Sequence, residues 1–185
     1  MKKYALHIDL DDYNESVYHG IYSDLNGCIC DSEKYKNLRN DGFEEVDMLH
    51  DKDAIIAAFS EKMNRLANVA VPGDFVFITY AGHGGTIEDF NKDEESENDE
   101  TLVLYDGLWI DDETKIILNK FKSGIIVVWI SDSCHSGTNT RFASQFSPNN
   151  PESAIKTRGL SSSALREIYE GNKKYYDKEW GLIKN

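Results

Sequence analysis

This 185-residue sequence has no long apolar run, because its longest apolar stretch comprises only the six residues from Ile125 to Ile130. A helix that crosses a bilayer needs about 20 apolar residues, so we expect no membrane-spanning segment. The start of the chain is basic, but His7 and Asp9 interrupt any apolar signal-peptide core. Cysteine is scarce too, and three cysteines, an odd number, do not form a disulfide framework. We therefore expect a reducing, cytoplasmic setting.

Basic residues are outnumbered, because 20 Lys and Arg face 33 Asp and Glu, which gives a formal charge of −13. Proteins that bind nucleic acids or anionic membranes need basic faces, so we expect neither partner. The acid is concentrated in one stretch, since Glu88–Glu100 holds eight acidic residues and a single lysine. Such a run is usually a solvated loop.

Short apolar runs alternate with helical patterns, and this alternation predicts an α/β domain with a largely parallel sheet. Asp51 or Asp53 is the expected N-cap of the strongest helix. The run 75–80 is typical of a strand buried on both faces, and the run 124–130 is the most apolar of all. We expect strands over 4–10, 43–49, 75–80, 101–105 and 124–130, and helices over 26–40, 55–70 and 112–121.

Two buried strands of this scheme end in residues that carry chemistry. His83 follows the strand over 75–80, and Cys134 follows the strand over 124–130. Catalytic groups gather beyond the carboxyl ends of parallel strands, so neighbouring strands would bring the imidazole and the thiol together. The imidazole could then deprotonate the thiol, and the backbone N–H groups of Gly84 and Cys134 could hold an oxyanion. The alternative is a buried structural cysteine and a histidine that only serves its loop.

The residues around His83 and Cys134 resemble the motifs of a known family. Tyr80-Ala-Gly-His83-Gly-Gly and Asp132-Ser-Cys134-His-Ser-Gly look like the histidine and cysteine motifs of caspase-like cysteine peptidases, and their separation of 51 residues agrees with that of caspases. The second motif is similar to that of metacaspases and their prokaryotic relatives, and Leu25–Asp31 resembles their first-helix motif. The resemblance covers Tyr4 to Gly137. It implies a caspase-like three-layer sandwich, with a mostly parallel central sheet flanked by helices, and a catalytic Cys–His dyad.

The same resemblance implies a cysteine endopeptidase whose protein or peptide substrates have Arg or Lys at the cleavage site. Asp31 and Asp132 match the acidic residues that line the family's pocket for the side chain before the scissile bond. Carboxylates there would bind a guanidinium group through paired, charge-assisted hydrogen bonds. Ala81 stands where metacaspases often have a serine, so one polar contact of the pocket is absent. Without a pocket, Asp132 would cap a turn and Asp31 would be a surface charge.

The peptidase chemistry requires no cofactor, but the resemblance raises calcium as an activator. Asp99, Asp111 and Asp112 match acidic positions associated with that site in metacaspases, whereas Arg141 lies in the region where a further acidic residue is expected. The acidic residues between 89 and 100 also have the spacing of an EF-hand loop, but Glu94 occupies the position that needs glycine. Two interpretations of these acidic residues therefore stay open, namely a calcium site and a solvated loop.

Strand counting indicates that the last strands of the caspase-like fold are absent, because no convincing apolar strand follows Gly137. We expect a catalytic domain over 1–140, similar to the large subunit (p20) of the family. Residues 141–185 would be a mobile loop and linker toward a small-subunit (p10-like) segment or partner chain. Basic residues in this tail offer sites for self-processing. Two other functions stay open: a catalytically silent caspase-like scaffold and a calcium-responsive regulatory module.

Overall fold

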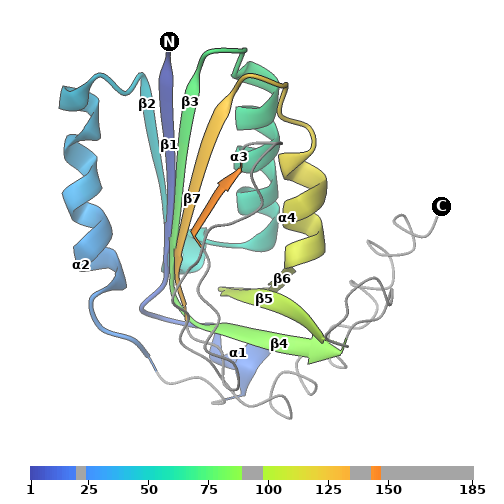
Figure 1. The fold of residues 1–185 in the computed structure, drawn as a ribbon. Helices are drawn as coiled ribbons and strands as arrows, with labels where there is room; N and C mark the ends of the chain where they lie inside the picture. The colour runs from blue at the N-terminus through green and yellow to red at the C-terminus, as the bar shows by residue number, and fades with distance from the viewer. Residues whose placement is uncertain (20–23, 89–97, 134–142, 147–185) are drawn as a thin grey trace.

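A computed structural model describes residues 1–19, 24–88, 98–133 and 143–146, which form a five-stranded and a three-stranded sheet (Figure 1). The strand order of the larger sheet is β2-β1-β3-β7-β8. Its first four strands run parallel, and β8 runs antiparallel to β7 at the edge. The strands of this sheet are β1 (Lys3–Asp9), β2 (Glu45–His50), β3 (Phe75–Ala81), β7 (Ile126–Asp132) and β8 (Ala143–Phe146).

Helices lie on both faces of this sheet (Figure 1). On one face are α3 (Ile56–Val69) and α4 (Asp111–Leu118). On the other face, α2 (Cys28–Ser32) continues into the 3₁₀ helix η1 (Glu33–Asp41), which ends at Gly42 with a φ of 83°. The expected fold class, a mostly parallel sheet between helical layers, is therefore confirmed.

The smaller sheet lies beyond the carboxyl ends of the parallel strands, beside the short helix α1 (Glu15–Tyr18) (Figure 1). It is antiparallel and consists of β4 (Gly84–Glu88), β5 (Asn98–Leu104) and β6 (Gly107–Ile110). The sequence predicted only β5. The glycine-rich segment after His83 enters β4, because the hydrogen bonds to β5 satisfy its backbone.

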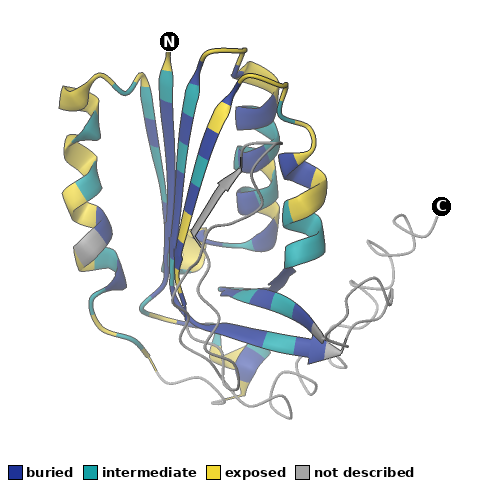
Figure 2. Cartoon of the chain, in the orientation of Figure 1, coloured by how far each residue is buried: buried dark blue, intermediate teal, exposed yellow. Residues whose placement is uncertain are grey.

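The main core lies between the larger sheet and the α3–α4 layer (Figure 2). Alternate side chains of β1 and β3 point into it, which is the period of two expected of a strand. Each large aliphatic or aromatic side chain buried in this way contributes about 1.5–3 kcal/mol of transfer free energy. The residues with no exposed surface include Leu6, Ile8, Val76, Ile78, Phe59 and Met63.

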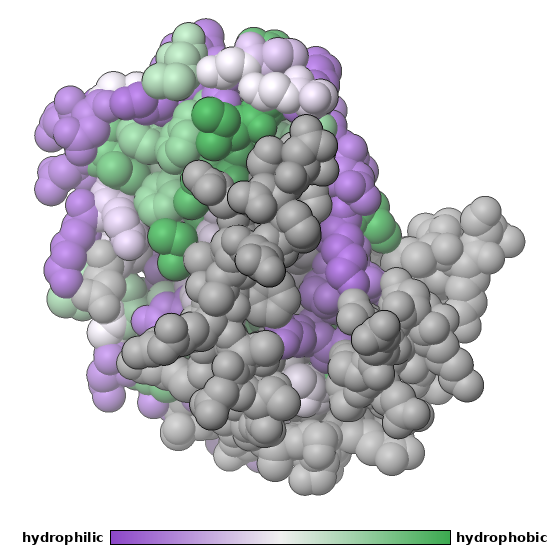
Figure 3. Space-filling view, viewed as in Figure 1, coloured by the Kyte–Doolittle hydropathy of each residue, from purple (hydrophilic) through white to green (hydrophobic). Residues whose placement is uncertain are grey.

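The opposite face of the sheet is only partly covered, and here the expectation of a fully buried β7 is wrong. Ile126 is 48% exposed and Ile130 is 42% exposed, because α2 and η1 lie over β1 and β2 and leave β7 open. The space-filling view shows hydrophobic side chains gathered on this face beside a hydrophilic helix (Figure 3). The run 124–130 was apolar enough for two covered faces, but one of them lacks a cover within the described residues.

Two local predictions also need correction. Asp51 and Asp53 do not cap α3; they form the 3₁₀ turn η2 (Asp51–Asp53), and the first N–H of α3, on Ile56, donates to the carboxylate of Asp106 at 2.8 Å. A strand does follow Gly137, namely β8. The division into 1–140 and 141–185 stays a prediction, since most of 141–185 lies outside the described residues. No helix in the described ranges has the length and apolarity to cross a membrane.

Candidate active site

The strands β3 and β7 end in register, and this brings the two predicted catalytic segments to one edge of the sheet. Ala81 pairs with Asp132, and the N–H of Gly82 donates to the carbonyl oxygen of Asp132 at 3.2 Å. His83 is the second residue after Ala81, and Cys134 is the second residue after Asp132 in the sequence. Cys134 itself lies outside the described residues, so its position relative to His83 remains a prediction.

The backbone of His83 is held from three directions. Its N–H donates to the hydroxyl of Tyr13 at 2.8 Å. Its carbonyl oxygen accepts hydrogen bonds from the Tyr80 hydroxyl at 2.5 Å and from the N–H of Val103 at 3.0 Å. The residue is only 9% exposed, and the Tyr13 ring lies against the imidazole with 5.0 Å between the ring centroids. These contacts fix the histidine at the start of β4.

Tyr13 and Tyr80 support the backbone of the predicted catalytic histidine, and the sequence analysis gave neither of them a role. Burial raises the pKa of Tyr13 above its usual range, so this phenol stays neutral and keeps its hydrogen bonds. Both hydroxyls lie so close to Gly82 that a Cβ there would stand 2.6 Å from Tyr80 Oη and 2.9 Å from Tyr13 Oη. Only glycine therefore fits before His83. Tyr13 follows the carboxyl end of β1, and the rule that located His83 at this edge would have located Tyr13 as well.

The structure describes some of the residues predicted to hold the oxyanion and to bind the substrate. Gly84 directly follows His83 and is the first residue of β4. Asp132 is exposed at the end of β7, between the buried Ser131 and Ser133, whose hydroxyl oxygens lie 2.9 Å apart. The backbone of Asp31 belongs to α2, on the face of the sheet where Ile130 is exposed. The side chain of Asp31 is outside the description.

The three predicted calcium ligands lie at one end of the β5–β6 pair. Thr101 of β5 pairs with Ile110 of β6, so Asp99 lies near Asp111 and Asp112, which open α4. Asp99 is 3% exposed. The ammonium group of Lys115, however, lies 3.1 Å from the Asp111 carboxylate and 3.2 Å from the Asp112 carboxylate, and it would oppose a divalent cation.

No group of three or more His, Cys, Asp or Glu side chains suited to a metal ion occurs among the described residues. The EF-hand-like spacing falls largely on 89–97, which lie outside the description. Calcium binding stays a prediction for a titration to test.

Comparison with protein families identifies the family to which this sequence belongs. The family described as "Metacaspase, peptidase C14 domain" matches residues 3–142. The chain belongs to the metacaspase family. The match includes both β3 and β7, and the resemblance of the sequence to metacaspases is confirmed.

Individual metacaspases are similar to this chain in sequence. Metacaspase-1 of Saccharomyces cerevisiae is 33% identical over 136 residues, which cover 65% of this chain and 32% of that protein. Metacaspase-1 of Eremothecium gossypii is 34% identical over 149 residues, which cover 72% of this chain and 32% of that protein. The chain thus spans about a third of the length of these relatives. A crystal structure of a Geobacter sulfurreducens protein superposes with a TM-score of 0.77 at 32% identity, covering 96% of this chain and 64% of that one.

Proposed function

We propose that this chain is the catalytic part of a cysteine endopeptidase that cleaves peptide bonds after Arg or Lys. The observation that carries the proposal is the in-register ending of β3 and β7. Two residues beyond the paired Ala81 and Asp132 stand the histidine and the cysteine of a metacaspase sequence. A thiol and an imidazole at one rim suit nucleophilic catalysis better than they suit a scaffold.

The mechanism uses His83 as acid and base and Cys134 as nucleophile. His83 takes the thiol proton, and the Cys134 thiolate attacks the carbonyl carbon of the scissile bond. Two backbone N–H groups, those of Gly84 and Cys134, hold the oxyanion of the tetrahedral intermediate. The intermediate collapses as the C–N bond breaks and His83 gives its proton to the leaving amine. Water, deprotonated by His83, then hydrolyses the thioester and releases the acid product.

Selection of a basic side chain is assigned to Asp31 and Asp132. Asp132 is exposed at the edge of the sheet, two residues before the nucleophile, which is where the side chain preceding the scissile bond would enter. Arg binds a pair of carboxylates more strongly than Lys because its planar guanidinium donates two parallel hydrogen bonds to each. The absence of a serine at Ala81 leaves more of the binding to the carboxylates.

A further segment, similar to the small subunit of the family, completes the enzyme in this proposal. The exposed Ile126 and Ile130, which share one face of β7, support it, because exposed aliphatic surface on a sheet is typical of a face that another segment covers. Self-processing would occur at basic residues of the tail, namely Lys156, Arg158, Arg166, Lys173, Lys174, Lys178 and Lys184. Mass spectrometry of the full chain, after incubation, should find new ends directly after one of these residues.

The central test is cleavage of fluorogenic peptide amides that end in Arg, Lys, Asp or Ala. The wild-type chain, together with the small-subunit-like segment that completes it, should release the fluorophore from the Arg and Lys peptides only. Cys134→Ala should abolish this activity, and Cys30→Ala, which removes an exposed thiol of α2, is the matched control and should retain it. Activity that survives Cys134→Ala would disprove the mechanism.

The same experiment separates the alternative functions. A catalytically silent scaffold would cleave none of the peptides, and Cys134 would not react with an arginine-directed electrophile. A calcium-responsive module would bind calcium in a calorimetric titration without any effect of Cys134→Ala. Cleavage of the Asp peptide alone would retain the peptidase and refute the assignment of Asp31 and Asp132.

A further inference from the structure

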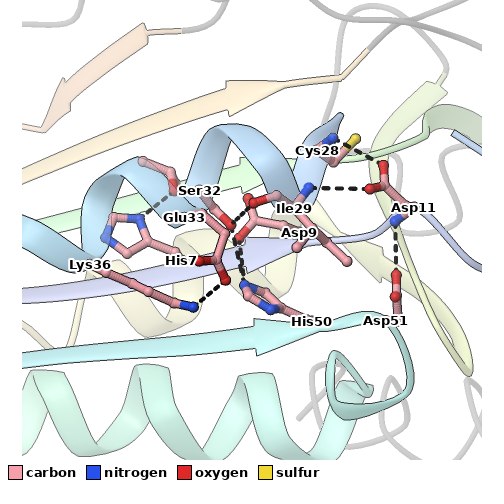
Figure 4. A network of polar contacts seen from close by, with 11 residues as sticks. His7, Asp9, Asp11, Cys28, Ile29, Ser32, Glu33, Lys36, His50 and Asp51 are labelled. Carbon is pink, nitrogen blue, oxygen red and sulfur yellow. Dashed lines mark hydrogen bonds and ion pairs between the residues drawn. The ribbon is translucent and has the colours of Figure 1, made fainter. Parts of the chain in front are cut away.

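The short helix α2, which carries Asp31, is tied down at its N-terminal end by a carboxylate that the proposed mechanism does not use. The two oxygens of Asp11 accept hydrogen bonds from the backbone N–H groups of Cys28 at 3.0 Å and Ile29 at 3.4 Å, the first two residues of α2 (Figure 4). The carbonyl oxygen of Asp11 accepts a third, from the N–H of Leu25 at 2.8 Å. Asp11, the second residue after β1, thus determines where α2 begins.

Asp11 is itself fixed from the end of β2. The carboxylate of Asp51 accepts a hydrogen bond from the backbone N–H of Asp11 at 2.8 Å (Figure 4) and a second one from the backbone N–H of Asp12 at 2.9 Å. Asp51 has a φ of 43°, a conformation that few residues other than glycine adopt. Such a conformation persists where surrounding contacts enforce it, and here the two hydrogen bonds do so.

The C-terminal end of α2 is held by a second set of polar side chains. The hydroxyl of Ser32, the last residue of α2, donates to the carbonyl oxygen of Ile29 at 2.9 Å and lies 3.2 Å from His50 Nε2. The same nitrogen lies 3.6 Å from Asp9 Oδ2. Asp9 is 2% exposed, and a buried carboxylate is stable only beside such a partner. The His50 ring therefore stands between Ser32 of α2 and Asp9 of β1 and links α2 to the sheet.

The second anchor, His50, stands in the same row as the candidate specificity residue of β7. His50 pairs with Asp9, Asp9 pairs with Ala81, and Ala81 pairs with Asp132, so the four lie side by side across the carboxyl edge of the sheet. Asp31 precedes Ser32 in α2, on the face of the sheet to which this row points. The distance between the backbone of Asp31 and the end of β7 thus depends on both anchors.

We propose that Asp11 and His50 are positioning residues, which hold α2 so that Asp31 and Asp132 can bind one basic substrate side chain together. This inference rests on the proposed function, because it concerns the same site. Two carboxylates bind a guanidinium in a bidentate manner only if both are held within about half an ångström of the required geometry. Neither Asp11 nor His50 touches the substrate in this scheme; each acts through α2.

The test compares variants at the two anchors with a matched control on another helix. Asp11→Ala removes the N-terminal anchor and His50→Leu removes the C-terminal one, whereas His50→Gln retains an N–H at the position of Nε2. Asp106→Ala is the control, because Asp106 caps the first N–H of α3 at 2.8 Å in the same manner but on the opposite face of the sheet. The readouts on the full chain are KM and kcat for the Arg peptide amide and the Kd of benzamidine, an arginine-like cation, measured by calorimetry.

We expect Asp11→Ala and His50→Leu to raise KM and the benzamidine Kd by about tenfold, the factor that corresponds to the loss of one good helix cap. We expect kcat to change by no more than about twofold, because a positioning residue for binding does not affect the bond-breaking step. His50→Gln should recover most of the wild-type KM. Asp106→Ala should lower the melting temperature and leave KM and the benzamidine Kd unchanged.

Other outcomes would overturn the inference, the proposed function or both. If Asp11→Ala and His50→Leu bind benzamidine like the wild type while hydrogen exchange shows that α2 has loosened, α2 does not position the site. If Asp106→Ala weakens binding as much as they do, the effect is general destabilisation. A wild-type chain that binds benzamidine but cleaves no peptide refutes the proposed function alone, and the Kd values still decide the inference. A wild-type chain that does neither refutes both.

Discussion

Acidification should destabilise this chain through one buried histidine, His7 of β1. His7 has no exposed surface, and its ring stacks on Tyr35 with 4.5 Å between the centroids. Its Nδ1 lies 2.7 Å from the Thr79 hydroxyl, and Nε2 has no hydrogen-bond partner among the described residues. Burial, with a smaller contribution from the charge of nearby His50, lowers the pKa of His7 from 6.5 to about 4.

The loss in the free energy of unfolding follows from the difference between the pKa of His7 in the unfolded and the folded chain. Between pH 6.5 and pH 4 the unfolded chain binds a proton on His7 that the folded chain does not bind, so the free energy of unfolding falls as the pH falls. At 1.36 kcal/mol per pKa unit, the loss relative to pH 7 is about 2 kcal/mol at pH 5 and about 3 kcal/mol at pH 4. Below pH 4 both states bind the proton, and this contribution becomes constant.

The assay is urea denaturation followed by tryptophan fluorescence at pH 7, 5 and 4. His7→Phe is the informative variant, because a phenyl ring can keep the stacking on Tyr35 but cannot titrate. Its loss of the Thr79 hydrogen bond costs about 1 kcal/mol at every pH and cancels in the comparison. His19→Asn, at the exposed end of α1, is the control and should keep the wild-type difference. If wild type and His7→Phe lose the same free energy between pH 7 and pH 4, the reasoning is refuted.

Three further predictions concern the edge where His83 lies and the turn before β3. Tyr80→Phe should lower the free energy of unfolding by about 1–3 kcal/mol in urea denaturation, because its hydroxyl serves buried backbone groups of His83 and Val103, and an unchanged value would contradict this. Gly82→Ala should lower both the melting temperature and the peptide cleavage rate, because the Cβ would stand 2.6 Å from Tyr80 Oη; a variant with wild-type values would show that the tyrosines move aside. Hydrogen bonds from the backbone N–H groups of Lys2 and Val71 hold the pKa of Asp74 below its ordinary value of 3.8, so the folded state gains stability above that pH and loses it as the pH falls through the lowered pKa. Asp74→Asn should therefore have a lower melting temperature than wild type at pH 7, and the gap should close toward pH 2; a gap that stays constant would contradict the prediction.

The parallel strands and the longest helix could be predicted from the sequence because their information is local. The runs that became β1, β3 and β7 are apolar, and α3 repeats its apolar residues at helical spacing. The strand β6 was missed although Asp106-Gly107 is a strong hairpin signal. Only two residues separate the end of β5 at Leu104 from the start of β6. β4 was missed because its two glycines favour a loop, and only pairing with β5 makes it a strand.

The features that the sequence could not predict depend on contacts between distant residues. Asp106 caps a helix that begins 50 positions earlier, and no local pattern indicates this. The tyrosine hydroxyls that hold His83 likewise come from β3 and from the segment after β1. The two sequence motifs identified the chemistry of the site, whereas the polar anchors of α2 became visible only when β1, β2 and α2 were placed together.

The strand order also bears on how the protein folds. The residues joined by β3 and β7 are separated by roughly 50 positions, and the whole of β4, β5, β6 and α4 lies between them. Closing such long intervening segments is among the slower steps of folding, and β1 pairs with β3 across an even longer stretch, from Lys3 to Phe75. A chain still emerging from the ribosome, with β7 not yet docked, would have His83 at its edge and no opposing segment. In the proposed mechanism, proteolytic competence would thus arrive only with the completion of the central sheet.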